Sequence, residues 1–306
     1  MIRLRRLKAG DRVAFVAPAS GASRGEVDTA AAGLTPFGLR ASYDDSVFAK
    51  ERFTAGSPAA RAEAIHKALL DPDVGGLIAI RGGYGSAQLL PLLDIKLLQS
   101  ARKPLIGYSD ITTLLWLYVQ NGLTAIHGPM ADRRLSKGAE GFDADSFRRV
   151  VMSEEPAGEL CPPQLEPMHA GTATGVLVGG TLTQLMASLG TPWAFQPPEG
   201  AILFLEDVGE RPYRIHRLLT QGAQAGVFTH ARAIVFGEFP GCDEPGGEPA
   251  IRDVLRDFTA DLRIPVLFNF PSGHTAGATW TLPFGVRAEV VAGPAPVVRI
   301  LESAVQ

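Results

Sequence analysis

Short apolar runs alternate with amphipathic stretches along the first half of the chain. The apolar runs, which predict strands, cover residues 12–17, 76–80, 105–108 and 124–127. Apolar residues at helical spacing predict helices over residues 58–70, 85–99 and 111–120. Ser57 and Pro58 supply an N-cap and a first turn for the first helix, and Pro91 should break or kink the second. Strands that alternate with helices favour βαβ units and a parallel sheet covered by helices.

The second half has more strands for each helix. Residues 153–174 are rich in proline, glutamate and glycine and show no periodicity, so we expect a linker there. Beyond it, short apolar runs predict strands over residues 175–178, 201–205, 233–236, 265–268, 288–291 and 297–301, with helices over 181–189, 212–221 and 249–259. The pattern predicts an α/β protein with a parallel-sheet N-terminal domain (1–152), a linker (153–174) and a smaller mixed α/β C-terminal domain (175–306).

Composition narrows the class of protein. The 306 residues are 46% hydrophobic and 20% charged, which is ordinary for a soluble globular protein. The net charge of −3 offers no basic excess for nucleic acid or an anionic membrane. The two cysteines form neither a disulfide framework nor a zinc motif, and the early apolar run is too short for a signal peptide. We therefore expect a cytoplasmic protein with no metal site.

Ser109 lies between a predicted strand, PLIGY, and a predicted helix, ITTLLWLYVQ. Such a turn exposes a serine hydroxyl and aims the next backbone N–H groups, with the helix dipole, at one point. That arrangement suits a nucleophile beside half of an oxyanion hole. The motif departs from the hydrolase GxSxG elbow because Ile111 stands where the second glycine would be. The alternative is that Ser109 is an ordinary helix N-cap.

The glycine-rich segment RGGYG, residues 81–85, follows an apolar strand directly. Ligands bind at the carboxyl ends of strands in open α/β sheets, and glycines let the backbone approach them closely. The segment matches no nucleotide-binding motif. Arg81 beside it is a candidate to hold a substrate carboxylate, with a structural ion pair as the alternative. Tyr84 is a second candidate substrate-binding residue, and a tight turn remains the plainer interpretation of the loop.

Glu206 and His274 also follow predicted strands. Glu206 ends the run AILFLE, and His274 lies in a glycine-bounded loop after PVLFNF. The alternatives are a solvated strand end for Glu206 and a structural role for His274, and His127 competes as the proton carrier. Ser109, Glu206 and His274 together satisfy the nucleophile, orienting acid and base of acyl transfer. Because they fall in different predicted domains, a shared site would lie in a cleft between the domains.

At these motifs the chain resembles the LD-carboxypeptidase family of serine peptidases, which includes microcin-immunity-type peptidases. The resemblance rests on the segments RFTAGSPAAR, GLIAIRGGYGS, PLIGYSDIT, LFLEDVGERPYRIHRLLTQ and PSGHTAGATWTLPFG. It implies a flavodoxin-like N-terminal domain and a homodimer, with no metal and no cofactor. It also implies Ser109 as nucleophile, His274 as general base and Glu206 as the carboxylate that orients it. The oxyanion hole would be formed by the N–H groups of Asp110 and Gly83.

The activity implied by the resemblance is removal of the terminal D-alanine from murein tetrapeptide, a small peptide substrate, during cytoplasmic peptidoglycan recycling. Two alternatives remain. A hydrolase with the same chemistry could act on a peptidyl-nucleotide or a general ester, as the microcin-immunity type cleaves an aminoacyl nucleotide. A non-enzymatic module could bind a small anion at the RGGYG loop, but it would leave Ser109, Glu206 and His274 without a reason to converge.

Overall fold

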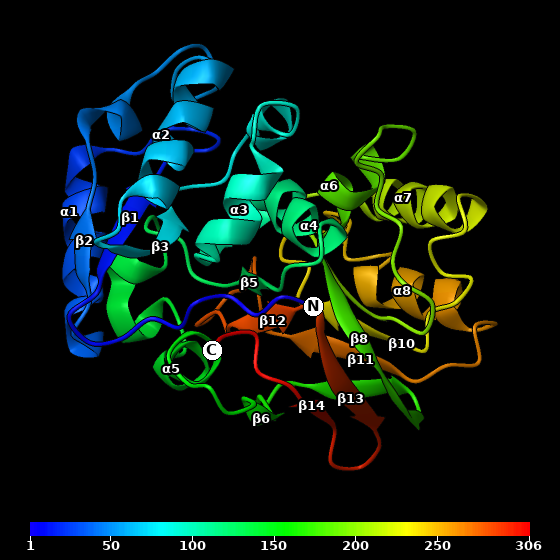
Figure 1. Cartoon of the computed structure of the whole chain (residues 1–306). Coiled ribbons are helices and arrows are strands. Elements are labelled where there is room, and N and C mark those ends of the chain that lie inside the picture. Colours follow the sequence, from blue (N-terminus) through cyan, green and yellow to red (C-terminus); the bar gives the residue numbers. More distant parts are fainter. The chain divides into compact units, whose positions relative to one another are not determined.

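The computed structural model describes all 306 residues, which divide into two compact units (Figure 1). Unit 1 comprises Met1–Pro156, Gly277–Gly285 and Ser303–Gln306, and unit 2 comprises Ala157–Ala276 and Val286–Glu302. The expected C-terminal domain, residues 175–306, therefore does not coincide with unit 2. Gly277–Gly285 and Ser303–Gln306 belong to unit 1, and unit 2 begins earlier, at Ala157. The interpretation of residues 153–174 as an irregular linker is wrong, because half of them, residues 158–160, 166–169 and 171–174, form strands of unit 2.

Unit 1 is built on a six-stranded sheet in the order β12-β5-β4-β3-β1-β2. Its strands are β1 (Arg12–Val16), β2 (Arg40–Ser42), β3 (Val74–Ala79), β4 (Leu105–Gly107), β5 (Ala125–His127) and β12 (Leu282–Phe284). The first five pair in parallel, which confirms the predicted parallel sheet. β12 pairs antiparallel with β5, with Leu282 opposite His127. The sequence pattern did not predict β2 or β12, whose short runs are ordered by pairing with the neighbouring strand.

The helices of unit 1 are α1 (Arg24–Gly33), α2 (Pro58–Leu70), α3 (Ile95–Ala101), α4 (Thr112–Gln120) and α5 (Ala144–Val151). α2 begins as predicted, with the Ser57 hydroxyl accepting a hydrogen bond from Ala60 N at 3.3 Å. The predicted break at Pro91 is also confirmed, because residues 85–99 form a 3₁₀ turn (Ser86–Leu89) and then α3. α2 lies beside α3, and α4 packs on β4 and β5 (Figure 1).

Unit 2 is built on an eight-stranded mixed sheet in the order β6-β14-β13-β8-β9-β10-β11-β7. Its strands are β6 (Gly158–Leu160), β7 (Glu166–His169), β8 (Gly171–Thr181), β9 (Ile202–Glu206), β10 (Ala233–Gly237), β11 (Val266–Phe270), β13 (Val286–Ala292) and β14 (Val297–Ile300). β8 to β11 pair in parallel and the outer strands pair antiparallel. β6 and β7 pair with β14 and β11, which orders the segment expected to be a linker. The predicted mixed α/β architecture is confirmed.

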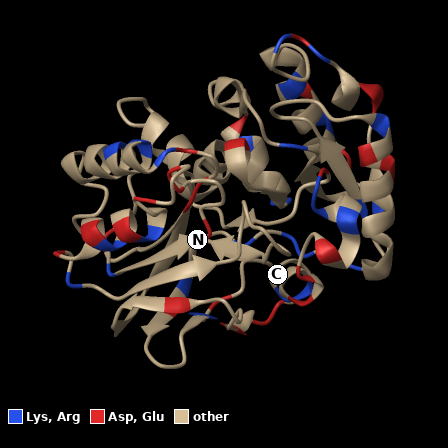
Figure 2. Ribbon diagram, turned by 180° about the vertical axis from the view of Figure 1, so that it is seen from behind, with Lys and Arg blue, Asp and Glu red and all other residues tan.

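Three helices belong to unit 2, namely α6 (Leu182–Ala187), α7 (Pro212–Gln224) and α8 (Ile251–Thr259), and α7 contacts both others. Acidic and basic residues are interspersed along the helices (Figure 2). In α8, for example, Arg256 lies 2.8 Å from Asp253. None of the helices combines the length and the apolar character needed to cross a membrane.

Candidate active site

Ser109 adopts a left-handed backbone conformation between β4 and α4, with φ of 62°. This region is sparsely populated by residues other than glycine and concentrates at functional sites. The turn is held by a hydrogen bond from Ile111 N to Tyr108 O of 3.1 Å. The N-cap interpretation of Ser109 is wrong, because α4 has Ile111 as its N-cap and no side-chain cap. The Ser109 side chain is partly exposed, as the strand-to-helix position predicts.

Asp110 fastens this turn to the glycine-rich segment. Its side chain is 2% exposed, and its carboxylate accepts a hydrogen bond of 2.8 Å from Ser86 N. The Ser86 hydroxyl donates in turn to Asp110 O and lies 2.6 Å from the Thr113 hydroxyl. Burial raises the pKa of the Asp110 carboxyl, while the Ser86 hydrogen bonds oppose that shift. Ser86 was missed by sequence reasoning, although it directly follows the RGGYG motif.

Gly82 and Gly83 lie where a side chain would not fit. A Cβ at Gly82 would lie 2.8 Å from Cβ and 2.9 Å from Oγ of Ser109. Gly83 has φ of 103°, and a Cβ there would lie 2.3 Å from the Ser20 hydroxyl oxygen. That hydroxyl donates to Phe53 O at 2.7 Å and accepts from Tyr84 N at 3.4 Å. The glycine loop therefore lies directly against the candidate nucleophile, as its predicted place at a strand end requires.

Arg61 is a buried cation that sequence reasoning did not select. The whole residue is only 3% exposed. Its guanidinium donates to the carbonyl oxygens of Gly85 at 2.9 Å and Gly56 at 3.1 Å, and also to Pro18 O. Desolvation lowers the pKa of Arg61. The sequence signal that could have indicated its burial is its position in the apolar stripe of α2, four residues before Ile65. Arg61 ties the loop after β1, the start of α2 and the glycine loop to one another.

Arg81 lies beside a buried carboxylate. Its Nε is 3.6 Å from Oδ2 of Asp132, whose residue is 4% exposed. Burial raises the pKa of Asp132 to about 6, and the positive charge of Arg81 opposes that rise. This ion pair matches the structural alternative for Arg81, whereas the Arg81 side chain is 37% exposed and keeps surface for a ligand. Tyr84 is 55% exposed and lines an open pocket together with Ser20, Gly83 and Gln88.

In unit 2, Glu206 and His274 form a hydrogen-bonded pair. Nδ1 of His274 lies 2.8 Å from Oε2 of Glu206, and His274 N donates to the same oxygen at 3.0 Å. Glu206 is fully buried at the end of β9, so the interpretation of a solvated strand end is wrong. The hydroxyl of Thr181, which faces Glu206 across the β8–β9 register, donates to Oε1. A carboxylate held in this way fixes the orientation of the imidazole.

Gly273 and Asp207 complete the surroundings of this pair. Gly273 has φ of 81°, and a Cβ there would lie 2.8 Å from Cδ of Glu206. Asp207 is buried and accepts hydrogen bonds from Thr183 N at 2.9 Å and the Thr183 hydroxyl at 2.6 Å. Burial raises the pKa of Asp207 to about 6 against these hydrogen bonds, and the charge of Glu206 adds to the rise.

His127 is fully buried in β5, with its ring centroid 5.3 Å from that of Phe284 and 6.1 Å from that of Tyr108. This packing suits a structural residue better than a proton carrier. No cluster of three or more histidine, cysteine, aspartate or glutamate side chains is arranged to hold a metal ion. The candidate groups for acyl transfer are thus Ser109 with the glycine loop in unit 1 and the Glu206–His274 pair in unit 2.

Comparison with known proteins identifies the class of enzyme. Residues 13–128 match the LD-carboxypeptidase N-terminal domain, and residues 174–290 match the LD-carboxypeptidase C-terminal domain. These matches place the chain among the serine-type peptidases, so it is a hydrolase. The chain belongs to the LD-carboxypeptidase family.

Individual relatives agree with this assignment. The murein tetrapeptide carboxypeptidase of Pseudomonas aeruginosa is 35% identical over 286 residues, covering 90% of this chain and 92% of that protein. The crystal structure of the muramoyltetrapeptide carboxypeptidase of Oxalobacter formigenes is 29% identical with a TM-score of 0.83, covering 95% of this chain and 99% of that one. The microcin C7 self immunity protein MccF has a TM-score of 0.91 over both whole chains at 22% identity, which shows the same fold.

Proposed function

We propose that this enzyme removes the terminal D-alanine from murein tetrapeptide, with Ser109 as nucleophile, His274 as general base and Glu206 as the orienting carboxylate. The observation that carries the proposal is the left-handed backbone conformation of Ser109, with φ of 62°. Its side chain lies so close to Gly82 that a Cβ on that glycine would not fit. A strained serine on a strand-to-helix turn has its hydroxyl presented for attack. The names of the relatives, which refer to murein and muramoyl peptides, favour this substrate over a peptidyl-nucleotide.

In the proposed reaction, Oγ of Ser109 attacks the carbonyl carbon before the terminal D-alanine while Nε2 of His274 accepts the hydroxyl proton. The N–H groups of Asp110 and Gly83 stabilise the oxyanion of the tetrahedral intermediate. Collapse of the intermediate breaks the C–N bond, and His274 returns the proton to the leaving amine. Water then attacks the acyl-enzyme with His274 as base, which releases the shortened peptide and regenerates Ser109.

Glu206 has the properties that this proposal needs in an orienting group. It is fully buried, and Thr181 and the backbone of His274 hold both of its oxygens. The carboxylate cannot rotate without losing hydrogen bonds in a buried place, so the imidazole that it holds by Nδ1 stays in one orientation. The negative charge also stabilises the imidazolium that forms when His274 takes the proton.

We assign the carboxylate of the terminal D-alanine to Arg81, with Tyr84 as a second contact. The guanidinium has an exposed face beside the glycine loop, and a planar guanidinium matches a carboxylate in a bidentate way. The buried carboxylate of Asp132, 3.6 Å from Nε of Arg81, would hold the guanidinium in position. The proposal extends to a role in peptidoglycan recycling in the cytoplasm and to a homodimeric enzyme, both expected from the family resemblance.

The test compares two peptides that differ only at the terminal α-carbon, one ending in D-alanine and the other in L-alanine. Inversion exchanges the methyl and carboxylate directions, so the carboxylate leaves its cationic partner. Loss of a charge-assisted hydrogen bond costs about 1.5–3 kcal/mol, which predicts a preference for the D-ended peptide of at least about tenfold in kcat/KM.

Ser109→Ala should lower kcat by about 10⁴-fold or more, whereas the control Ser100→Ala, at an exposed serine of α3, should match wild type. Mass spectrometry of the released alanine gives the rate for each peptide and for each variant. Equal rates on the two peptides would argue against an LD-carboxypeptidase and for the esterase or peptidyl-nucleotide alternative. A Ser109→Ala variant with a tenth of wild-type turnover would refute the nucleophile.

A further inference from the structure

One peptide group of the glycine-rich segment lies between two buried charges. Its carbonyl oxygen, Gly85 O, accepts a hydrogen bond of 2.9 Å from the guanidinium of Arg61. Its N–H group, at Ser86, donates to Oδ2 of Asp110 at 2.8 Å. A peptide dipole has its negative end at the oxygen and its positive end at the N–H, so both hydrogen bonds are charge-assisted. We call this arrangement the Arg61–Asp110 bridge.

The two charges of the bridge compensate each other through the peptide group that they share. Arg61 is 3% exposed and Asp110 2% exposed. The other acceptors of the guanidinium, which are the carbonyl oxygens of Pro18 and Gly56 and the side chain of Gln88, carry no charge. Burial raises the pKa of the Asp110 carboxyl, and the positive charge of Arg61 opposes that rise. Because a buried charge without a partner is costly, each end of the bridge depends on the other.

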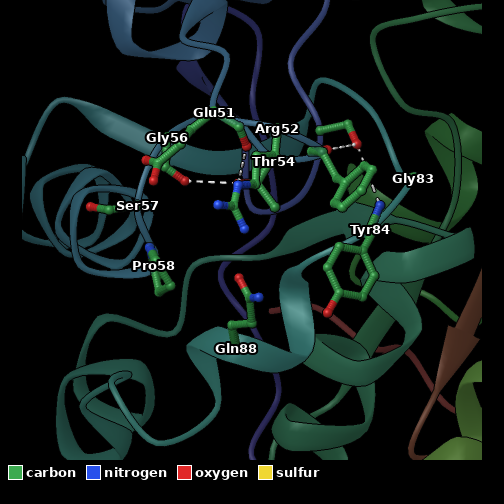
Figure 3. A pocket seen from close by; sticks show the side chains of 11 residues that line it. Glu51, Arg52, Thr54, Gly56, Ser57, Pro58, Gly83, Tyr84 and Gln88 are labelled. Atoms are coloured by element: carbon green, nitrogen blue, oxygen red, sulfur yellow. Dashed lines mark hydrogen bonds between the residues drawn. The ribbon is translucent and has the colours of Figure 1, made fainter.

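Arg61 has a fixed position from which it holds Gly85 O. Its Nε donates to Gly56 O at 3.1 Å, and its Nη2 donates to the side-chain oxygen of Gln88. Gly56 and Gln88 line an open pocket beside the glycine loop (Figure 3). Gly85 has φ of 121°, and a Cβ there would lie 2.9 Å from Nη1 of Arg61 and 2.6 Å from Cγ2 of Thr54. The guanidinium thus lies against a backbone conformation that requires glycine.

The bridge joins the two segments that would supply the oxyanion hole. The proposed donors are the N–H groups of Gly83 and Asp110, which belong to separate loops. Ser86 holds these loops together, because its N–H donates to the Asp110 carboxylate and its hydroxyl donates to Asp110 O. Both donors must lie about 2.7–3.1 Å from the developing oxyanion, so a small change in the separation of the loops weakens the hydrogen bonds that they make.

We propose that Arg61 and the Asp110 carboxylate are positioning residues, which fix the oxyanion hole by holding the peptide group between Gly85 and Ser86 from both sides. Neither charge contacts the substrate, and both act through this peptide group. The inference rests on the proposed function, because it takes the N–H groups of Gly83 and Asp110 as the oxyanion donors. It gives the buried cation of α2 a part in the rate of the reaction rather than in substrate affinity.

The first measurement separates the rate of the reaction from substrate affinity. Arg61→Gln removes the charge, and we expect kcat for the peptide that ends in D-alanine to fall by about 10- to 100-fold, with KM within about twofold of wild type. Titration with a fluorophosphonate counts the active sites, so that kcat refers to folded enzyme. A peptide aldehyde, which forms a tetrahedral adduct with the serine, should lose affinity by a factor similar to that of kcat. The shortened peptide product, which needs no oxyanion hole, should bind as it does to wild type.

Lys103→Gln is the matched control, because Lys103 is also a buried cation held by carbonyl oxygens. It is 5% exposed, and its Nζ donates to Ala68 O at 3.1 Å and to Asp71 O. Lys103 precedes β4, whereas Ser109 follows that strand. The control should lower the melting temperature, since it removes a buried charge from its acceptors, but it should keep wild-type kcat and wild-type affinity for the aldehyde.

The second measurement is a double-mutant cycle. Asp110→Asn removes the negative charge but keeps an oxygen that can accept a hydrogen bond from Ser86 N, and it should lower kcat by about tenfold or more. The double variant, Arg61→Gln with Asp110→Asn, should lose no more than about threefold beyond the less active single variant, because no uncompensated buried charge remains in it. Residues that act independently would instead multiply their losses.

Several results would overturn the inference while the proposed function stands. These are multiplied losses in the double variant, a single variant that keeps more than about half of wild-type kcat, a change in KM alone, or an equal loss of kcat in Lys103→Gln. If Arg61→Gln does not fold, Asp110→Asn decides by the same kcat, KM and aldehyde measurements. Failure of wild type to release alanine from the peptide that ends in D-alanine overturns the proposed function and this inference together.

Discussion

Replacement of Gly273 by alanine tests whether the Glu206–His274 pair has any freedom to move. The added Cβ would lie 2.8 Å from Cδ of Glu206 and 3.0 Å from each carboxylate oxygen. Ordinary carbon contacts begin near 3.4 Å, so the carboxylate or the His274 loop must shift by about 0.6 Å. Glu206 is fully buried and held by Thr181, so we expect the loop and the imidazole to move.

A shift of this size exceeds the tolerance of about 0.5 Å within which catalytic groups must be held. A catalytic group misplaced by about 1 Å lowers the reaction rate by roughly 10²-fold. Gly273→Ala should therefore lower kcat by about 10- to 100-fold with little change in KM. Alanine at φ of 81° also costs about 1–2 kcal/mol of backbone strain, which should lower the melting temperature by a few degrees. The assay is steady-state release of D-alanine, together with thermal unfolding of each variant.

Gly247→Ala is the matched control, because Gly247 has φ of 84° and no atom within 4 Å of the added Cβ. It should suffer the same strain and the same loss of stability but keep wild-type kcat. If Gly273→Ala retained half of wild-type kcat with a melting temperature like that of Gly247→Ala, the reasoning that the carboxylate has no room would be refuted.

Three further predictions concern titratable groups. His274→Ala should lose turnover by at least about 10³-fold, whereas His127→Ala should keep turnover and lose stability; the reverse result in steady-state assays would exchange their roles. The pKa of Asp207, raised from 3.8 to about 6, means that the folded state holds the proton more tightly. Its contribution to stability is therefore complete below about pH 4 and lost as the pH rises to about 6, so Asp207→Asn should remove up to about 3 kcal/mol of pH dependence from melting curves over that interval. A pH profile unchanged in the variant would show that Asp207 does not titrate there. Arg81→Lys should raise KM several-fold with kcat unchanged if the guanidinium binds the substrate carboxylate in a bidentate way, and unchanged kinetics would indicate that its pairing with Asp132 is only structural.

Local patterns were enough to predict much of both sheets. Buried parallel strands such as β3 and β9 are continuous apolar runs, and α2 has Ser57 and Pro58 at its start. Those signals depend on residues close together in the chain. The strand-to-helix turn at Ser109 and the strand end at Glu206 followed from the same local signals, and this is why both residues could be selected from the sequence.

Only the tertiary structure decided features that depend on partners distant in the chain. β12 is a three-residue run that becomes a strand because β5, far earlier in the sequence, offers a free edge. The left-handed φ of Ser109, the burial of Arg61 beneath three loops and the close approach of Gly273 to Glu206 likewise leave no local pattern. The sequence by itself determined which elements form and which residues stand at their ends. The tertiary structure decided which of those residues are buried, strained or held against one another, because these properties arise from atoms that the order of residues does not bring together.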